Sequence, residues 1–265
     1  MMYRLSEASV FSSKKKLEQL PEGKLLINTI NAHSYNQAQK DSLFAEALAG
    51  GDVLIPDGAS IVKACRWLKA KSQPKERIAG WDLFSFEMEQ LEKESEKISL
   101  KNETSGLAVH KLKVMFMGSS EKVLEKIRLR AATDYPHIDV VTYSPPYKPE
   151  FSEEDNTAII KAINEANPDL LWIGMTAPKQ EKWAYQNWEE LHINCHVGTI
   201  GAVFDFFAGT ARRAPLWWQK HSLEWLYRLC MEPGRMWRRY VLGNPLFLWN
   251  IVREMTQGSK TQEEP

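Results

Sequence analysis

The first two hundred residues alternate short apolar runs with segments of helical periodicity, and this alternation restricts the fold more than any other feature. It is typical of β-α units stacked around a mainly parallel sheet. The apolar runs are predicted strands, and they comprise 24–29, 52–55, 113–117, 138–142, 169–173 and 195–197. The predicted helices comprise 32–49, 59–70, 82–93, 121–133, 153–166 and 179–191. The sequence therefore predicts an α/β fold with a Rossmann-like, mainly parallel sheet and flanking helices.

Three parts are expected along the chain. The body spans 1–210 and consists of two β-α halves, which the polar and charged stretch 92–110 joins as an exposed connection. Beyond the body the pattern changes to helices punctuated by prolines, so 211–255 is predicted to be a helical appendage. Residues 256–265 are predicted to be a disordered tail.

Basic residues and tryptophans are concentrated near the C-terminus, although the net charge of the chain is zero. Between Ala211 and Arg253 lie five of the ten tryptophans, with Glu224 and Glu232 as the acidic residues. The basic residues of the same stretch are Arg212, Arg213, Lys220, Arg228, Arg235, Arg238, Arg239 and Arg253. A basic, aromatic-rich segment favours an anionic partner such as a membrane surface. Composition supports equally a terminal helical hairpin that packs its aromatic rings on the core and leaves its arginines in solvent.

Cysteine usage and hydropathy restrict the cellular setting. Cys65, Cys195 and Cys230 are far apart and form no CxxC pair, which fits a reducing cytoplasm and argues against a disulfide framework or a zinc knuckle. No stretch approaches the roughly 20 apolar residues that span a bilayer. The longest apolar run, 241–252, is interrupted by glycine, proline and asparagine and is not predicted to cross a membrane.

Asp57 is the candidate catalytic residue. It directly follows a predicted strand, and in an open parallel sheet ligands bind beyond the carboxyl ends of the strands. Pro56 restricts the backbone and Gly58 permits a sharp turn, which would hold the carboxylate at the rim of the sheet. A carboxylate in that place can accept the proton of an attacking hydroxyl group. An ordinary Pro-Asp-Gly turn explains the same three residues, and taken alone it is the more common explanation.

Four further residues at strand exits or helix starts are candidates for substrate binding. Thr29 and Asn31 could hydrogen-bond a sugar or a uracil, although Asn31 could equally cap the following helix. Arg77 precedes a helix and would suit a diphosphate, unless it is a solvated surface residue. Gln180 follows Pro178 at the start of another helix, where backbone donors and a side-chain amide could hold a phosphate or a sugar.

The arginines of the C-terminal segment are candidates for phosphate binding. Arg228, Arg235, Arg238 and Arg239 follow one another at spacings of seven, three and one, and steps of three, four and seven residues share one face of a helix. The Pro233-Gly234 pair is expected to break the helix between the first two. Guanidinium groups bind phosphate in a bidentate manner, and interleaved tryptophans favour the bilayer interface.

Several functional classes find no support in the sequence. Gly118-Ser119-Ser120 lacks both the GxGxxG and the Walker pattern, so NAD and ATP binding are not predicted. No DxD pair occurs, so we expect neither a metal nor a resident cofactor. A nucleic-acid-binding protein could use the basic segment, but the mildly acidic body and its loops rich in glycine, hydroxyl and amide groups argue against this.

A set of ordered motifs relates the chain to a known family. The markers are Thr29-Ile30-Asn31, Pro56-Asp57-Gly58, Arg77 to Asp82, Ala177 to Glu181, and a long block from Val197 to Arg239. Together they resemble the bacterial WecG/TagA/CpsF glycosyltransferase family over about 26–249, nearly the whole chain. The resemblance implies an inverting, metal-independent enzyme with a UDP-sugar donor. The sugar would be N-acetylmannosamine, its uronic acid or a similar N-acetylhexosamine, and the acceptor a sugar linked to a polyprenyl diphosphate in cell-surface polysaccharide synthesis.

The resemblance also implies roles for individual residues. Asp57 corresponds to the family's proposed general base, and Thr29 and Gln180 to polar residues of its active site. Arg77 corresponds to an arginine of the pocket. Arg228, Arg235 and Arg238 correspond to arginines of an appendage that closes over the diphosphate and holds the enzyme on the membrane. The protein is therefore expected in the cytoplasm, peripherally associated with the inner face of the cell membrane, with a homo-oligomer as a further expectation.

The main alternative is a non-catalytic protein that binds anionic membrane surfaces through the C-terminal segment. That alternative explains the arginines and tryptophans but leaves Asp57 without a role. Release of UDP from UDP-sugars, with and without a polyprenyl-diphosphate sugar, distinguishes the two.

Overall fold

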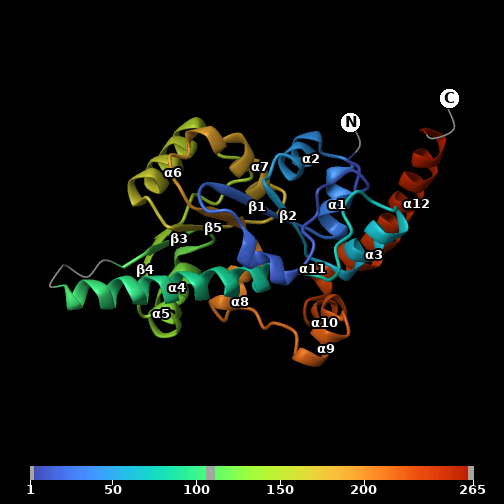
Figure 1. Ribbon diagram of the computed structural model, residues 1–265. Helices are drawn as coiled ribbons and strands as arrows, with labels where there is room; N and C mark the ends of the chain where they lie inside the picture. The colour runs from blue at the N-terminus through green and yellow to red at the C-terminus, as the bar shows by residue number, and fades with distance from the viewer. Residues whose placement is uncertain (1–2, 106–110, 262–265) are drawn as a thin grey trace. The chain divides into compact units, whose positions relative to one another are not determined.

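Six strands form one sheet in the computed structural model, which describes residues 3–105 and 111–261, without the side chains of 258–261 (Figure 1). The strands are β1 (Leu25–Ile30), β2 (Val53–Pro56), β3 (Lys113–Gly118), β4 (Asp139–Tyr143), β5 (Leu170–Gly174) and β6 (His196–Thr199). Their order in the sheet is β2-β1-β6-β5-β3-β4. The pairs β1·β6, β6·β5, β5·β3 and β3·β4 are all parallel. Each predicted strand ends within two residues of an observed one, so the predicted α/β fold is confirmed.

Helices connect the strands and continue to the C-terminus. They are α1 (Ala32–Ala38), α2 (Ser42–Ala49), α3 (Ala59–Trp67), α4 (Gly80–Thr104), α5 (Glu121–Asp134), α6 (Glu153–Ala166), α7 (Lys179–Gln186), α8 (Gly201–Phe207), α9 (Leu216–Lys220), α10 (Glu224–Met231), α11 (Pro233–Trp237) and α12 (Gly243–Thr261). Short 3-10 turns occur at Lys14–Gln19 and Trp188–Glu190, and a π-helical turn, η3, at Arg238–Leu242. The predicted disordered tail, 256–265, is helical as far as Thr261, and 262–265 lie outside the described residues.

Two predicted boundaries were wrong. The single helix predicted over 32–49 is divided into α1 and α2, because Asp41 caps a new helix by accepting a hydrogen bond from Phe44 N at 3.0 Å. The polar stretch 92–110 was predicted to be an exposed connection, but α4 continues through it to Thr104. Within this stretch Ser95 is buried, and its hydroxyl donates to His137 O at 2.5 Å and accepts from Leu112 N at 2.9 Å. Residues 106–110 lie outside the described part of the chain.

The chain divides into two compact units, and the second comprises 17–28 and 80–211. In this unit α6 and α7 lie on one face of the sheet, and α4, α5 and α8 lie on the other (Figure 1). Aromatic rings fill the second face, where Phe116 packs between Phe204 and Phe207 with ring centroids 5.3 and 6.3 Å away. A Cβ on Gly198 would lie 2.2 Å from the ring of Trp172, so only glycine fits at this position of β6.

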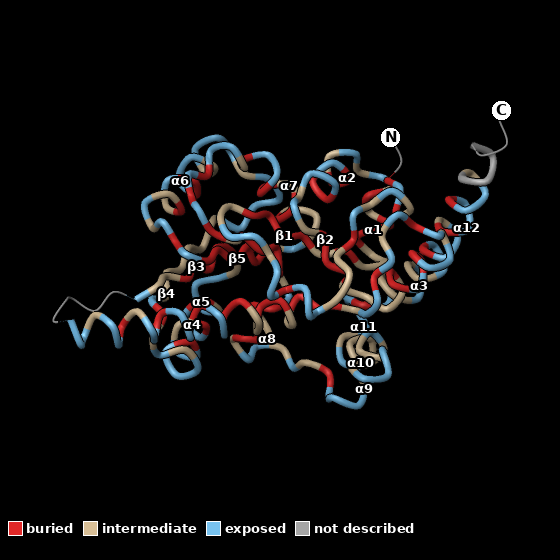
Figure 2. The backbone as a smooth tube through the Cα atoms, viewed as in Figure 1, coloured by how far each residue is buried: buried red, intermediate tan, exposed pale blue. Residues whose placement is uncertain are grey.

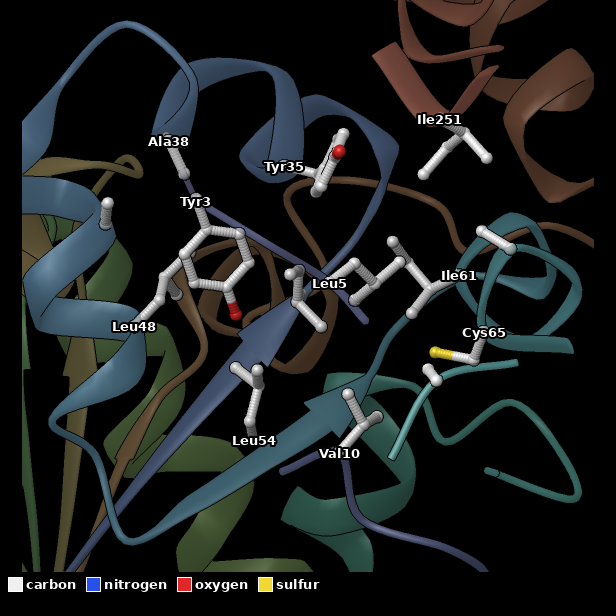
Figure 3. Packing of buried hydrophobic residues seen from close by; sticks show 14 of the residues in the cluster. Tyr3, Leu5, Val10, Tyr35, Ala38, Leu48, Leu54, Ile61, Cys65 and Ile251 are labelled. Atoms are coloured by element: carbon white, nitrogen blue, oxygen red, sulfur yellow. The ribbon is translucent and has the colours of Figure 1, made fainter. Parts of the chain in front are cut away.

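The first unit comprises 1–16, 29–79 and 212–265, and its core joins the start, the first β-α elements and the end of the chain. Figure 3 shows Leu5, Tyr35, Leu54 and Ile251 directed into this common core. Helix α12 packs against α1, and buried positions alternate with exposed ones along it (Figure 2). In the described part of the chain, no helix is both long and apolar enough to cross a membrane.

A buried carboxylate links α12 to the rest of the first unit. Glu254 is 4% exposed; its Oε2 accepts from Tyr35 Oη at 2.6 Å and its Oε1 from Ser6 N at 2.7 Å. Two donors from distant parts of the chain therefore depend on a single side chain of α12.

Replacing Glu254 by Ala should lower the free energy of unfolding by about 2 kcal/mol or more, because two buried donors lose their acceptor. The free energy is measured by urea unfolding of the full chain. Arg253→Ala, at the exposed neighbouring position of α12, is the control and should change it by about 0.5 kcal/mol or less. Equal effects of the two substitutions would contradict a structural role for the Glu254 contacts.

Candidate active site

Asp57 lies where three segments of the first unit are joined by backbone hydrogen bonds. Its own N–H donates to Ile30 O, the last residue of β1, at 2.8 Å. Ile78 N donates to Pro56 O, the last residue of β2, at 3.0 Å. The carboxyl ends of both strands and the segment that carries Arg77 therefore meet at Asp57, as expected for residues that follow parallel strands.

Arg77 lies between two carboxylates. Its Nη2 is 2.5 Å from Glu224 Oε2, at the start of α10, and 3.7 Å from Asp57 Oδ1. The other oxygen of Glu224 is 3.7 Å from Arg213 Nε. Glu224 is the most buried of the group, with 13% of its side chain exposed against 29% for Asp57. Positive and negative side chains therefore alternate in this cluster. Because 29% of the Asp57 side chain is exposed, a ligand from solution can contact Asp57.

The surroundings of Asp57 make it a stronger base than an ordinary aspartate. Burial, the largest influence, raises the pKa of Asp57 to about 6. The negative charge of Glu224 raises this pKa as well, whereas the positive charges of Arg77, Arg239 and Arg228 lower it. At neutral pH the carboxylate is therefore ionised and able to accept a proton.

Arg239 brings a further positive charge to the cluster. It lies in the π-helical turn η3, a form of helix that occurs often at functional sites. Burial lowers the pKa of Arg239, and its Nε is buried with no hydrogen-bond partner among the residues described. Its charge also helps burial to lower the pKa of His33, on α1, to about 4. A partly buried guanidinium group whose buried Nε lacks an acceptor is suited to an anionic ligand.

The three predicted tail arginines make different contacts. Arg228 lies on α10, one helical turn after Glu224, and its charge acts on Asp57. Arg235 is paired with Glu232 at 2.8 Å on the surface, and the guanidinium of Arg238 lies 5.4 Å from the ring centre of Trp237. The expected helix break is confirmed, because α10 ends at Met231 and α11 begins at Pro233.

Thr29 and Asn31 lie at the carboxyl end of β1 in the same unit. Thr29 is partly exposed. Asn31 caps α1: its Oδ1 accepts from His33 N at 3.0 Å and from Ser34 N at 3.1 Å. A Cβ placed on Gly58 would lie 3.7 Å from Asn31 Cβ, which shows how close the cap is to the turn that carries Asp57. The capping role is confirmed, and contact with a substrate stays a prediction.

Gln180 belongs to the second unit, where its amide connects two elements. Its Oε1 accepts from Met175 N and Gly201 N, each at 3.1 Å, and its Nε2 donates to Glu181 Oε1 at 2.9 Å. Burial raises the pKa of Glu181 to about 7. A Cβ on Gly201 would lie 2.1 Å from Met175 O, so this close approach requires glycine. Gln180 thus joins the end of β5 to the start of α8, and its predicted role in substrate binding stays a prediction.

Glu224 and Arg239 are the site residues that the sequence analysis did not select. Glu224 and Arg228 are four residues apart, which places them on one face of a helix, and this spacing could have drawn attention to Glu224. Arg239 is likewise four residues after Arg235, but it lies in a π-helical turn, where α-helical spacing does not hold. Among residues 3–105 and 111–261, no three or more His, Cys, Asp or Glu side chains are grouped so that they could hold a metal ion.

Comparison with known proteins confirms the resemblance seen in the motifs. A sequence model of the Glycosyl transferase WecG/TagA/CpsF family matches residues 4–261. A relative from Bacillus subtilis (strain 168), named N-acetylglucosaminyldiphosphoundecaprenol N-acetyl-beta-D-mannosaminyltransferase, is 30% identical over 86% of this chain and 79% of its own. Relatives with the same name occur in Bacillus spizizenii, at 27% identity over 96% and 90%, and in Staphylococcus aureus (strain MW2), at 27% over 86% and 80%.

The adjacent residues Arg238 and Arg239 allow a direct test of anion binding. Arg239→Ala should weaken binding of inorganic pyrophosphate to the full chain by about tenfold or more, because a charge-assisted contact from a partly buried side chain is lost. Isothermal titration calorimetry measures the affinity. Arg238→Ala, which removes the same side chain from an exposed position, is the control and should have the smaller effect. A larger loss for Arg238→Ala would show that Arg239 is not the anion ligand.

Proposed function

Because the chain belongs to the WecG/TagA/CpsF glycosyltransferase family, we propose that it transfers an N-acetylhexosamine-type sugar from UDP to a polyprenyl-diphosphate-linked sugar. The relatives are named for transfer of N-acetylmannosamine to N-acetylglucosaminyldiphosphoundecaprenol, which supports these two molecules as the transferred sugar and the acceptor. The product would serve the synthesis of a bacterial cell-surface polysaccharide. The observation that carries the proposal is Asp57, an aspartate of raised pKa within a cluster of arginines.

In the proposed mechanism Asp57 is the general base. It takes the proton of the acceptor hydroxyl group while that oxygen attacks the anomeric carbon of the donor sugar. The bond between the anomeric carbon and the diphosphate breaks, and UDP leaves from the opposite face, so the anomeric configuration is inverted. The raised pKa of Asp57 favours this step, because the carboxylate is ionised at neutral pH and still basic enough to hold the proton.

The arginines stabilise the charge that develops on the leaving diphosphate. Arg77, Arg228 and Arg239 all act on Asp57, so a diphosphate that adjoins the base would lie within reach of their positive charge. Guanidinium groups in this number can replace a divalent cation, and we therefore propose transfer that is independent of metal. Thr29, Asn31 and Gln180 are proposed to bind the sugar or the uracil, and Arg235 and Arg238 to contribute charge at the surface.

The C-terminal segment is proposed to hold the enzyme on the inner face of the cell membrane. Four of its tryptophans are exposed: Trp217 at 58%, Trp225 at 38%, Trp237 at 42% and Trp249 at 67%. Exposed aliphatic residues adjoin them in sequence, among them Leu216, Val241, Leu242, Leu248 and Val252. Exposed indole rings next to arginines favour an interface with anionic lipid over the tightly packed hairpin that composition also allowed.

Asp57→Asn should reduce kcat by about a hundredfold or more, while the affinity for UDP changes little. In the unchanged enzyme kcat/KM should fall as the pH drops through about 6, because protonation removes the base, and it should be level above that pH. Both quantities are measured by release of UDP in the presence of a polyprenyl-diphosphate acceptor.

The control is Asp52→Asn, the same substitution at the exposed residue before β2, which should keep kcat within about twofold. Near-normal turnover of Asp57→Asn would show that Asp57 is an ordinary turn residue and not the general base. The assays are run in excess EDTA and repeated with magnesium added. A strict requirement for magnesium would overturn metal independence but not the identity of the base.

Trp249→Ala and Trp237→Ala should each weaken binding to anionic phospholipid vesicles by about tenfold and leave transfer to a short, water-soluble acceptor unchanged. Sedimentation with vesicles measures the binding. Trp67→Ala removes a tryptophan of α3 that is 52% exposed, and it serves as the control. If all three variants sediment like the unchanged protein, the C-terminal tryptophans do not form the membrane contact.

A further inference from the structure

We propose that Glu224 is a positioning residue, which draws the guanidinium of Arg77 away from Asp57 so that the base keeps its reactivity. The inference rests on the proposed function, because it assumes that Asp57 is the general base and that Glu224 helps to maintain its basicity. Neither the family resemblance nor the motif analysis assigns Glu224 a role.

The distances within the cluster show which carboxylate Arg77 hydrogen-bonds. A single nitrogen, Nη2, makes both contacts: it is 2.5 Å from Glu224 Oε2 and 3.7 Å from Asp57 Oδ1. The shorter distance is a charge-assisted hydrogen bond, and the longer one exceeds hydrogen-bonding distance. Arg77 therefore hydrogen-bonds Glu224 and acts on Asp57 through its charge alone.

The position of Glu224 itself is well supported. It is the first residue of α10, with 13% of its side chain exposed. Its second oxygen faces Arg213 at 3.7 Å, so each of its oxygens is directed to a different arginine. Glu224 is thus hydrogen-bonded to Arg77 and attracted by the charge of Arg213, and its hydrogen bond can keep Arg77 where it is.

The consequence for Asp57 follows from simple electrostatics. A directly paired arginine lowers the pKa of an aspartate by roughly 1–3 units, and a weaker base accepts the hydroxyl proton less readily. The charged groups that act on Asp57 are Arg77, Glu224, Arg239 and Arg228, and Glu224 is the one that raises its pKa. Without the charge of Glu224, Arg77 loses its 2.5 Å hydrogen bond and can move closer to Asp57, and the negative charge that raises the pKa of Asp57 is lost as well.

The test is the titration of Asp57 in the full chain, measured from the carbon-13 chemical shift of its carboxyl group and assigned with Asp57→Asn. In Glu224→Gln the pKa of Asp57 should fall by about one unit or more from its value of about 6. The acidic limb of the pH profile of kcat/KM should move to lower pH by the same amount, and kcat should fall by about threefold or more.

Two further variants keep the proposal open to refutation. Glu224→Asp retains the charge but withdraws it by one methylene, so it should lower the pKa of Asp57 less than Glu224→Gln does. In an Arg77→Gln background, Glu224→Gln should shift that pKa by less than half of its effect in the unchanged chain, because Glu224 acts largely through Arg77. Glu7→Gln breaks an exposed pair with Arg4, 3.0 Å apart, and is the control that should change nothing.

An unchanged or higher pKa of Asp57 in Glu224→Gln overturns the proposal. A lower KM for the donor at unchanged kcat also overturns it, because Glu224 would then be a competitor that occupies Arg77 in place of the diphosphate. The carboxyl titration needs no activity, so it is separable from the proposed function. If Asp57→Asn remains active, the general base is wrong, while the coupling between Glu224 and Asp57 is still measured.

Discussion

The charge of one guanidinium group, that of Arg77, is divided between two carboxylates, and the chemistry of the site depends on this division. Glu224 takes the hydrogen bond and Asp57 receives only the longer-range attraction. Asp57 can therefore lie among arginines, as the proposed binding of a diphosphate requires, without losing its basicity. The two demands oppose each other, because positive charge that binds a phosphate also weakens a nearby carboxylate base. A second acidic residue resolves the conflict.

The fold brings these groups together from distant parts of the chain. Parallel pairing places the ends of β1 and β2 at one edge, where Asp57 N binds Ile30 O. The C-terminal segment belongs to the same compact unit, because α12 packs on α1 and Glu254 binds Tyr35 and Ser6. One stretch of chain thus completes a core, supplies Glu224, Arg228 and Arg239 to the site, and exposes tryptophans. Because the same segment has these three roles, substitutions in α10 to α12 can affect the packing of the core, the charge of the site and the exposed surface.

The sequence predicted the sheet well, because buried parallel strands are short apolar runs between polar turns, as at β3 and β5. It also selected Asp57 and Arg77, which follow from strand exits and motif. It did not predict the full length of α4, since the buried hydroxyl of Ser95 looks polar in a sequence, nor the division at Asp41. Arg239 lies in a π-helical turn, and Glu224 contacts Arg77 and Arg213 from distant parts of the chain, so neither was selected from the sequence. The role of Gln180 as a link between β5 and α8 likewise required coordinates.

The most direct test of the central claim is the structure of the product. The enzyme is incubated with UDP-N-acetylmannosamine and an N-acetylglucosaminyl diphosphate carrying a short polyprenyl chain, and the lipid is analysed by mass spectrometry and NMR. The account predicts a disaccharide on the lipid diphosphate, formed in step with UDP, whose new glycosidic bond has the anomeric configuration opposite to that of the donor. Retention of configuration, or release of UDP with the lipid unchanged, would contradict it.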